Sequence, residues 1–100
     1  MAAYDGMNLT FYEMLRVLME SASDKANVPK LYKLLSQQPA HMLTSHMGNG
    51  RNLMHCSCMF SNMVAIKALL KLECSAQMID QLDEEGNTPL MLACRIKGRN

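Results

Sequence analysis

Aromatic side chains are scarce in this sequence, and neither sign of charge is in excess. Tryptophan is absent, and aromatic residues make up only 5% of the 100 residues. Because a base-stacking surface needs several aromatic rings close together, the three Tyr and two Phe residues are too few and too scattered for one. Ten basic residues against nine acidic ones leave a net charge of +1. Nucleic-acid-binding domains carry a strong basic patch, so we expect no nucleic-acid partner.

The sequence also lacks the segments that would direct it into or across a membrane. The start from Met1 to Asp5 has neither the basic residues nor the apolar run of a signal peptide. No stretch of 18 apolar residues occurs, so we expect no membrane-spanning helix and no membrane partner. Without a secretory signal, the four cysteines are expected to remain reduced. The sequence therefore predicts an intracellular protein of the cytoplasm, the nucleus or both.

The motifs that carry common enzymatic chemistry are missing as well. The sequence contains no Gly-rich phosphate-binding loop, no G-x-S-x-G and no H-E-x-x-H. The adjacent carboxylates of Asp83, Glu84 and Glu85 are expected to be solvated on a turn and not to form a tuned acid–base pair. We therefore predict a protein that is not an enzyme, with no catalytic residue and no cofactor.

The densest group of potential metal ligands is formed by His55, Cys56 and Cys58. Structural zinc sites commonly pair two Cys separated by two to four residues with two His separated by three to five. The single residue between Cys56 and Cys58 is too short a spacing, and no second pair follows. Buried cysteine packs like a small apolar residue, so we interpret these side chains as packing residues and predict no metal site. A thiol- or metal-responsive element built on these three residues remains the alternative.

Internal repetition is the main positive feature of the sequence. Residues 50–58 align with residues 86–94 at an offset of 36, and residues 31–35 align with residues 66–70 at an offset of 35. A recurring period near 35 residues is typical of a solenoid in which each structural unit packs on the next.

Helical spacing of the apolar residues supports this interpretation. Apolar residues recur at i, i+3, i+4 and i+7 over residues 11–22 and 28–35, and again over 63–70. Asn27 is a predicted N-cap of the second of these helices, and Pro89 opens a last helix that runs to about residue 96. Because sustained alternation of apolar and polar residues is absent, we predict an all-α fold.

Two stretches resemble a known family. GNTPLMLAC at residues 86–94 resembles the ankyrin-repeat signature G-x-T-P-L-H-x-A-A, and VAIKALL at residues 64–70 resembles the Val and Leu-Leu ending of that family's second helix. Met91 replaces the usual His, whereas the repeat at residues 50–58 keeps His55 but has Asn52 where Thr is usual. The resemblance implies an ankyrin-repeat solenoid of stacked helix–turn–helix units. Another helical repeat, of the armadillo or HEAT type, is the alternative.

The resemblance divides the chain into three parts. Residues 1–47 are expected to form a degenerate N-terminal helical pair or capping repeat, residues 48–82 a repeat, and residues 83–100 the first helix of a partial repeat. About one and a half repeats are thus recognisable. We expect the chain to belong to a larger protein, or the last helix to be covered by another chain over an apolar face that includes Leu90, Leu92 and Ile96.

A non-catalytic scaffold that binds a protein partner through its turns and inner helix surface is the function that the resemblance implies. Leu69 and Leu70 are both expected to be buried, one toward the preceding helix and one toward the next repeat. The partner-binding candidates are residues predicted to be exposed on two turns, namely Met47, Asn49, Arg51, Asn52, Gln81, Asp83, Glu84, Glu85 and Asn87.

Overall fold

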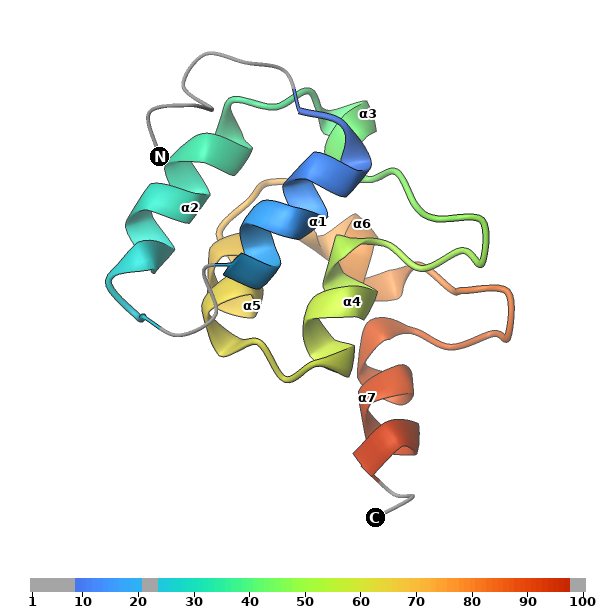
Figure 1. The fold of residues 1–100 in the computed structure, drawn as a ribbon. Coiled ribbons are helices and arrows are strands. Elements are labelled where there is room, and N and C mark those ends of the chain that lie inside the picture. Colours follow the sequence, from blue (N-terminus) through green and yellow to red (C-terminus); the bar gives the residue numbers. More distant parts are fainter. Residues whose placement is uncertain (1–8, 21–23, 98–100) are drawn as a thin grey trace.

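The protein was analysed as a computed structural model, which describes residues 9–20 and 24–97. Within these residues the chain forms seven helices and no strand, so the prediction of an all-α fold is confirmed (Figure 1). The helices in chain order are α1 (Phe11–Glu20), α2 (Asn27–Ser36), α3 (Ala40–Leu43), α4 (Leu53–Met59), α5 (Met63–Leu70), α6 (Ser75–Asp80) and α7 (Pro89–Lys97). In this described part of the chain, no helix has the length and apolar character that crossing a membrane requires.

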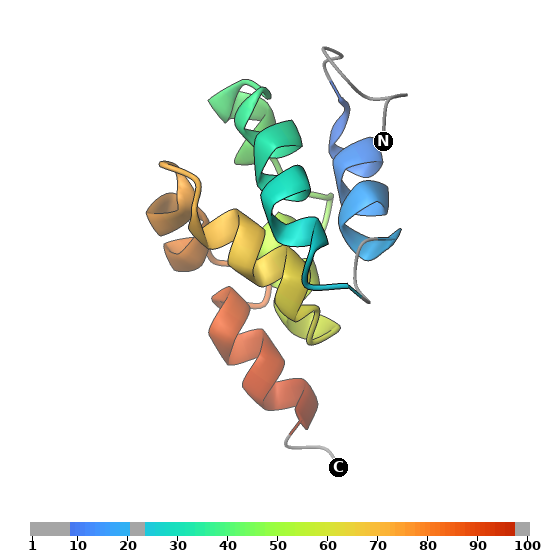
Figure 2. The ribbon, with the colours of Figure 1, turned by 90° about the vertical axis from the view of Figure 1, so that its left-hand side faces the viewer.

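Helices that lie one repeat apart in the sequence pack on each other. The inner layer consists of α1, α4 and α7, in which α4 contacts both of the others (Figure 1). The outer layer consists of α2 and α5, which lie side by side in Figure 2. This arrangement buries the apolar stripe of each helix against the equivalent helix of the next unit, as a solenoid requires.

The helix boundaries follow the sequence pattern closely, with one error at a cap. Helix α5 spans the predicted residues, and Pro89 opens α7 as expected. Thr88 caps α7, since its Oγ1 accepts a hydrogen bond of 3.2 Å from the backbone N–H of Met91. Asn27 is the first residue of α2 and not its N-cap; the preceding Ala26 has no side chain that could cap the helix. Ala22, in the predicted first helix, lies outside the described residues.

The long linkers after the outer helices hold two short helices. Helix α3 follows α2 and helix α6 follows α5, so the two occupy equivalent places in successive units. Each contributes an apolar side chain to the interior, Leu43 from α3 and Met78 from α6. The extra linker residues therefore extend the core rather than forming exposed loops.

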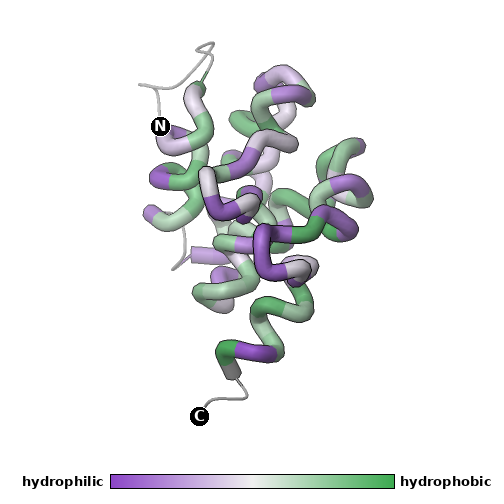
Figure 3. Tube along the Cα trace, turned by 90° about the vertical axis from the view of Figure 1, so that its right-hand side faces the viewer, coloured by the Kyte–Doolittle hydropathy of each residue, from purple (hydrophilic) through white to green (hydrophobic). Residues whose placement is uncertain are grey.

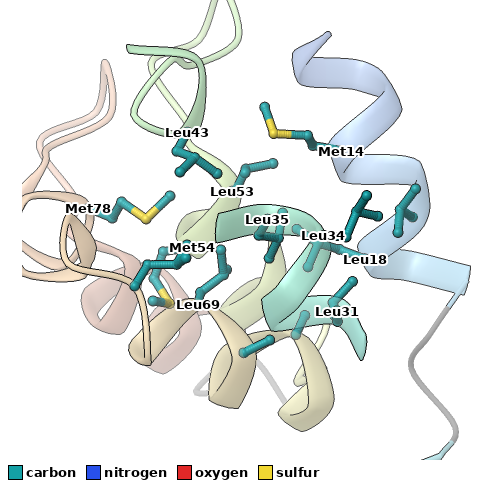
Figure 4. Close-up of a cluster of buried hydrophobic side chains, with 14 of the residues drawn as sticks. Met14, Leu18, Leu31, Leu34, Leu35, Leu43, Leu53, Met54, Leu69 and Met78 are labelled. Atoms are coloured by element: carbon teal, nitrogen blue, oxygen red, sulfur yellow. The ribbon is translucent and has the colours of Figure 1, made fainter. Parts of the chain in front are cut away.

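The core is a single cluster, mainly of Leu, Met, Val and Ala side chains, that extends from Leu9 just before α1 to Met78 in α6 (Figure 4). Met14, Leu53 and Leu69 are completely buried and come from α1, α4 and α5. Burying each such side chain contributes roughly 1.5–3 kcal/mol to folding. Buried methionines such as Met54 and Met78 fill the spaces between the leucines, in keeping with the flexible thioether chain.

The expectation that Leu69 and Leu70 are both buried is wrong for Leu70. Leu69 is fully buried, but Leu70 is 49% exposed. Helix α5 packs against α1, α2, α4 and α6, and these neighbours cover its Leu69 side. Among the described residues, no further outer helix packs on the face that holds Leu70. Leu90 is likewise 69% exposed, whereas Leu92 on the same helix is buried.

Candidate functional site

The first candidate turn connects α3 to α4 and is closed by backbone hydrogen bonds. The N–H of Met47 donates to the carbonyl of Arg51 and the N–H of Gly50 donates to the carbonyl of Met47, both at 2.9 Å. Gly50 has a φ of 81°, a left-handed conformation that glycine adopts without steric cost. The side chain of Asn49 accepts the N–H of Arg51 at 3.1 Å, which fixes the tip of the turn.

The second turn connects α6 to α7 and repeats this geometry. Asp83 donates its N–H to the carbonyl of Asn87 at 2.9 Å, and Gly86 donates to the carbonyl of Asp83 at 3.0 Å. Gly86 has a φ of 77°, close to that of its counterpart Gly50. One carboxylate oxygen of Asp83 accepts the N–H groups of Glu85 and Asn87, each at 2.9 Å. Asp83 therefore holds the second turn together from inside.

The two turns lie directly against each other, as Figure 1 shows on the right of the molecule. The N–H of Glu84 donates to the carbonyl of Asn49 at 2.9 Å, so the tips are joined through their backbones. A Cβ atom on Gly50 would lie 2.9 Å from the nitrogen of Glu84 and 3.0 Å from the Cα of Asp83. Gly50 is thus required both by its own φ and by the close approach of the second turn.

Ion pairs add a second connection between the units. The Nε of Arg51 lies 3.5 Å from Oδ2 of Asp83, and its Nη2 lies 3.6 Å from Oε1 of Glu85. On α7, Nη1 of Arg95 lies 3.9 Å from Oε2 of Glu85. Burial acts to raise the pKa of Asp83, but the N–H groups of Asn87 and Glu85 and the Arg51 guanidinium outweigh it and lower the pKa below its usual value. Asp83 is therefore ionised at neutral pH.

His55 links the first repeat to the second through the interior. Its Nε2 lies 2.8 Å from the carbonyl oxygen of Asn87. Because a carbonyl can only accept, Nε2 carries the proton, and Nδ1 is available to accept the N–H of Asn52 at 3.2 Å. The side-chain oxygen of Asn52 accepts the N–H of His55 at 2.9 Å, which completes a capping box at the start of α4. The side chain of Met91, which stands in the place of His55 one repeat later, has no hydrogen to donate.

The nine predicted partner-binding residues separate into three groups by burial. Asn49, Glu84 and Glu85 are exposed at the turn tips, and Met47, Arg51 and Gln81 are partly buried. The remaining three residues, Asn52, Asp83 and Asn87, are at most 6% exposed.

The expectation that all nine side chains are exposed is wrong for Asn52, Asp83 and Asn87, because each serves the interior of the stack. The Nδ2 of Asn52 donates to the carbonyl of Met78 at 3.0 Å and to the side chain of Gln81 at 2.8 Å. Asp83 closes its own turn, and Asn87 supplies the carbonyl that His55 contacts.

The structural roles of two polar residues were not predicted from the sequence. The inter-repeat role of His55 was missed, although its place in the Thr-Pro-Leu-His motif was the available signal. Asn62 was missed as well; it caps α5 by accepting the N–H of Ala65 at 3.1 Å and donates to the carbonyl of Leu18 at 2.9 Å. An Asn directly before an apolar helical run is a recognisable N-cap signal, but its contact with α1 depends on the tertiary fold.

The alternative of a metal- or thiol-responsive element finds little support in this geometry. No group of three or more His, Cys, Asp and Glu residues within the described ranges is arranged to hold a metal ion. His55 is fully buried and uses both ring nitrogens within the protein. Desolvation raises the pKa of Cys56, against a smaller lowering effect of Arg51, and desolvation also raises the pKa of Cys58. Neither thiol is thereby activated as a nucleophile.

Comparison with known proteins agrees with the stacked architecture. A family model described as ankyrin repeats in three copies matches residues 18–99. No curated protein and no solved structure matches the chain. The matched segment covers most of the sequence and contains both glycine turns and the helices packed between and beyond them. The chain therefore belongs to the ankyrin-repeat family.

Proposed function

We propose that the chain is a non-catalytic protein-binding scaffold that meets a protein partner with the tips of its two turns and the adjoining inner-helix surface. Ankyrin repeats are generally protein–protein interaction modules. The observation that carries the proposal is the hydrogen bond of 2.9 Å from the backbone N–H of Glu84 to the carbonyl of Asn49, which joins the two turns. The side chains of Glu84 and Asn49 stay exposed. A surface that is already ordered loses little conformational entropy on binding, and this favours affinity.

The contact residues that we propose are those turn residues whose side chains a partner can reach. Asn49 and Glu84 stand at the tips, and Glu85 is exposed beside them. Met47 and Arg51 are partly buried and would contribute at the edge of the surface. Asn52, Asp83, Asn87 and the partly buried Gln81 would support this surface indirectly, through the hydrogen bonds described above.

We also propose the division into units that the sequence predicts. Residues 1–47, which include α1 and α2, would act as a capping pair, residues 48–82 as a repeat, and residues 83–100 as a partial repeat.

The described cysteines are all free thiols, which supports an intracellular location in the cytoplasm or nucleus. Microscopy of a tagged chain would test the location, and a secreted product would contradict it.

Affinity capture followed by mass spectrometry tests the proposed binding surface. The double variant Asn49→Ala with Glu84→Ala removes two exposed tip side chains and leaves the buried residues of both turns intact. A matched control, Gln37→Ala with Glu73→Ala, removes one amide and one carboxylate at exposed positions outside the turns. We expect the control to retain the partner and the tip variant to lose it. Equal capture by the two variants would contradict the proposal.

A second candidate function is assembly with another chain that covers the outer face of α7. Leu82, Leu90 and Met91 are each more than half exposed, and Figure 3 shows α7 largely in the green of apolar residues. A Cβ on Gly86 would have no atom within 4 Å, whereas Gly50 touches the neighbouring turn. The turn at Gly86 is therefore open on the side where the equivalent turn at Gly50 is covered by the next unit. Exposed apolar surface such as that of Leu82, Leu90 and Met91 favours association.

Light scattering over a range of concentrations tests this second candidate. We expect the molar mass to rise with concentration, and the double change Leu90→Lys with Met91→Lys to abolish the rise. A constant monomer mass with a sharp unfolding transition would contradict a need for a covering chain.

A further inference from the structure

The inner surface contains a hollow beside the second turn that differs chemically from the turn tips. It has a volume of about 250 Å³ and lies between the end of α4, the turn and α7. Its polar wall is formed by Arg51, Glu85, Asn87 and Arg95. This wall brings two guanidinium groups together with one carboxamide and one carboxylate.

The hollow has more hydrogen-bond donors than acceptors. Arg51 and Arg95 reach carboxylate oxygens only at 3.5, 3.6 and 3.9 Å, which is longer than the 2.7–2.9 Å typical of charge-assisted hydrogen bonds. The Nη1 of Arg51 donates to the sulfur of Met59 at 3.5 Å, and a thioether is a weak acceptor. Neither arginine therefore has a close carboxylate partner of its own.

Asn87 gives independent evidence for a missing acceptor. This residue lines the hollow and is only 6% exposed, yet its Nδ2 is buried without any hydrogen-bond partner. A buried donor without an acceptor costs about 1–3 kcal/mol. Since the torsion about the Asn Cβ–Cγ bond is soft, a rotation of the amide would allow an acceptor placed in the hollow to remove this cost.

The charges around the hollow indicate a monoanion. Arg51 and Arg95 are balanced by Asp83 and Glu85, so the group is neutral as it stands. Asp83 is fixed by two backbone N–H groups, but the Glu85 side chain is 60% exposed and is held only by the two long ion pairs. When Glu85 turns out to solvent, two arginines face one carboxylate, and the net charge of +1 matches a single incoming carboxylate.

The other wall of the hollow is apolar and suits a short hydrocarbon stem. Met59, Leu92 and Ile96 form this apolar part of the lining. A glutamate side chain combines methylene groups with a carboxylate, and so matches both walls at once. We propose that this hollow receives a glutamate side chain of the protein partner, with Arg95 as its main charged contact and Glu85 as the group it displaces. The inference rests on the proposed partner-binding function and adds the chemistry by which one partner residue is recognised.

A titration with blocked peptides, followed by NMR of the isotope-labelled chain, tests the inference. The probe is leucine–glutamate–leucine with both ends blocked, and its matched control replaces the glutamate by glutamine. We expect saturable shifts of the amides of Asn87, Leu92 and Arg95 with the glutamate peptide, and binding roughly tenfold weaker with glutamine, as the loss of a charged hydrogen bond predicts. Equal shifts with the two peptides, or no shift with either, would overturn the inference.

Two variants and a third peptide sharpen the test. Arg95→Gln, at an exposed position, should weaken binding of the glutamate peptide about tenfold. Glu85→Gln should strengthen binding of the glutamate peptide severalfold, because the competing carboxylate is gone. Weaker binding of the peptide to this variant would contradict the displacement of Glu85. The third peptide carries glutamine with a free carboxyl terminus, and binding equal to that of glutamate would assign the site to chain ends and overturn the choice of a side chain.

The proposed function and this inference can fail separately. The tip variant Asn49→Ala with Glu84→Ala should lose the partner in the capture experiment but bind the blocked glutamate peptide as the unchanged chain does. Partner capture that depends on the tips, together with an absence of peptide binding, would overturn the glutamate site alone. Peptide binding without tip-dependent capture would overturn the proposed role of the tips.

Discussion

Replacing Gly50 by alanine should destabilise the protein far more than the same change at Gly86, although the two glycines occupy equivalent positions. Both have a positive φ, 81° for Gly50 and 77° for Gly86. An L-residue in this left-handed region costs about 1–2 kcal/mol, so this contribution is common to the two variants. Alanine also restricts the unfolded chain, which offsets about 0.4–1 kcal/mol of that cost in each case. Gly86→Ala should therefore lower the free energy of unfolding by about 1.5 kcal/mol or less.

The two variants differ in what the new methyl group meets. At Gly50 the Cβ would lie 2.9 Å from the backbone nitrogen of Glu84 and 3.0 Å from the Cα of Asp83, whereas at Gly86 nothing lies within 4 Å. The obstacle at Gly50 is backbone and cannot rotate away, so the turns must separate at an overpacking cost of about 1–3 kcal/mol. Separation also strains the hydrogen bond from Glu84 to Asn49, which contributes about 0.5–1.5 kcal/mol. We expect Gly50→Ala to cost about 2–5 kcal/mol in total.

Urea denaturation followed by far-UV circular dichroism measures this difference. With a slope of about 1–1.5 kcal/mol per M for a chain of this size, a gap of about 2 kcal/mol between the variants separates their midpoints by more than about 1 M. Such a loss is a large part of the stability of a small domain, so Gly50→Ala could be partly unfolded without denaturant. Equal midpoints for the two variants would refute the reasoning, because they would mean that the turns do not touch as described.

Three further predictions concern the core, the charged turn and the inter-repeat link. Leu69→Ala should lower the free energy of unfolding by about 2–5 kcal/mol because it leaves a cavity in the core. Leu70→Ala, at a half-exposed position, should lower it by about 1 kcal/mol or less. Similar urea midpoints for the two variants would contradict this difference. The pKa of Asp83 in the folded state is below its value of about 3.9 in the unfolded state. The contribution of Asp83 to stability is therefore complete above the unfolded-state pKa and is lost as the pH falls through the folded-state pKa. Asp83→Asn should thus be less stable than the unchanged chain at pH 7, and the gap should narrow toward pH 3 in urea titrations; a gap independent of pH would count against an ionised Asp83. His55→Met places at this position the residue found one repeat later and removes the donor to the carbonyl of Asn87. The change should lower the free energy of unfolding by about 1–3 kcal/mol, and with it the melting temperature. An unchanged melting temperature would disprove the link between the repeats.

The sequence by itself determined the architecture, because its signals are local. The offset of 36 residues that aligns Gly50 with Gly86 returns in the structure as two turns with nearly the same φ at the two glycines. Pro89 predicted the start of α7 to the residue, since a proline in the first turn of a helix costs no hydrogen bond. The apolar period predicted α5 in the same way. These features depend on neighbours only a few residues away in the chain.

Only the tertiary structure decided which side chains of these elements are exposed. Asn49 and Asn52 are the same residue type on one turn, yet Asn49 is exposed and Asn52 is fully buried, because α6 and its following segment supply acceptors for Asn52 alone. Leu69 and Leu70 are adjacent and chemically identical, but the neighbouring helices cover one side of α5 and not the other. The sequence specifies which residues turn, cap and repeat, whereas burial depends on which other unit packs against each face. That contact joins residues about one repeat apart, and no local pattern reports it.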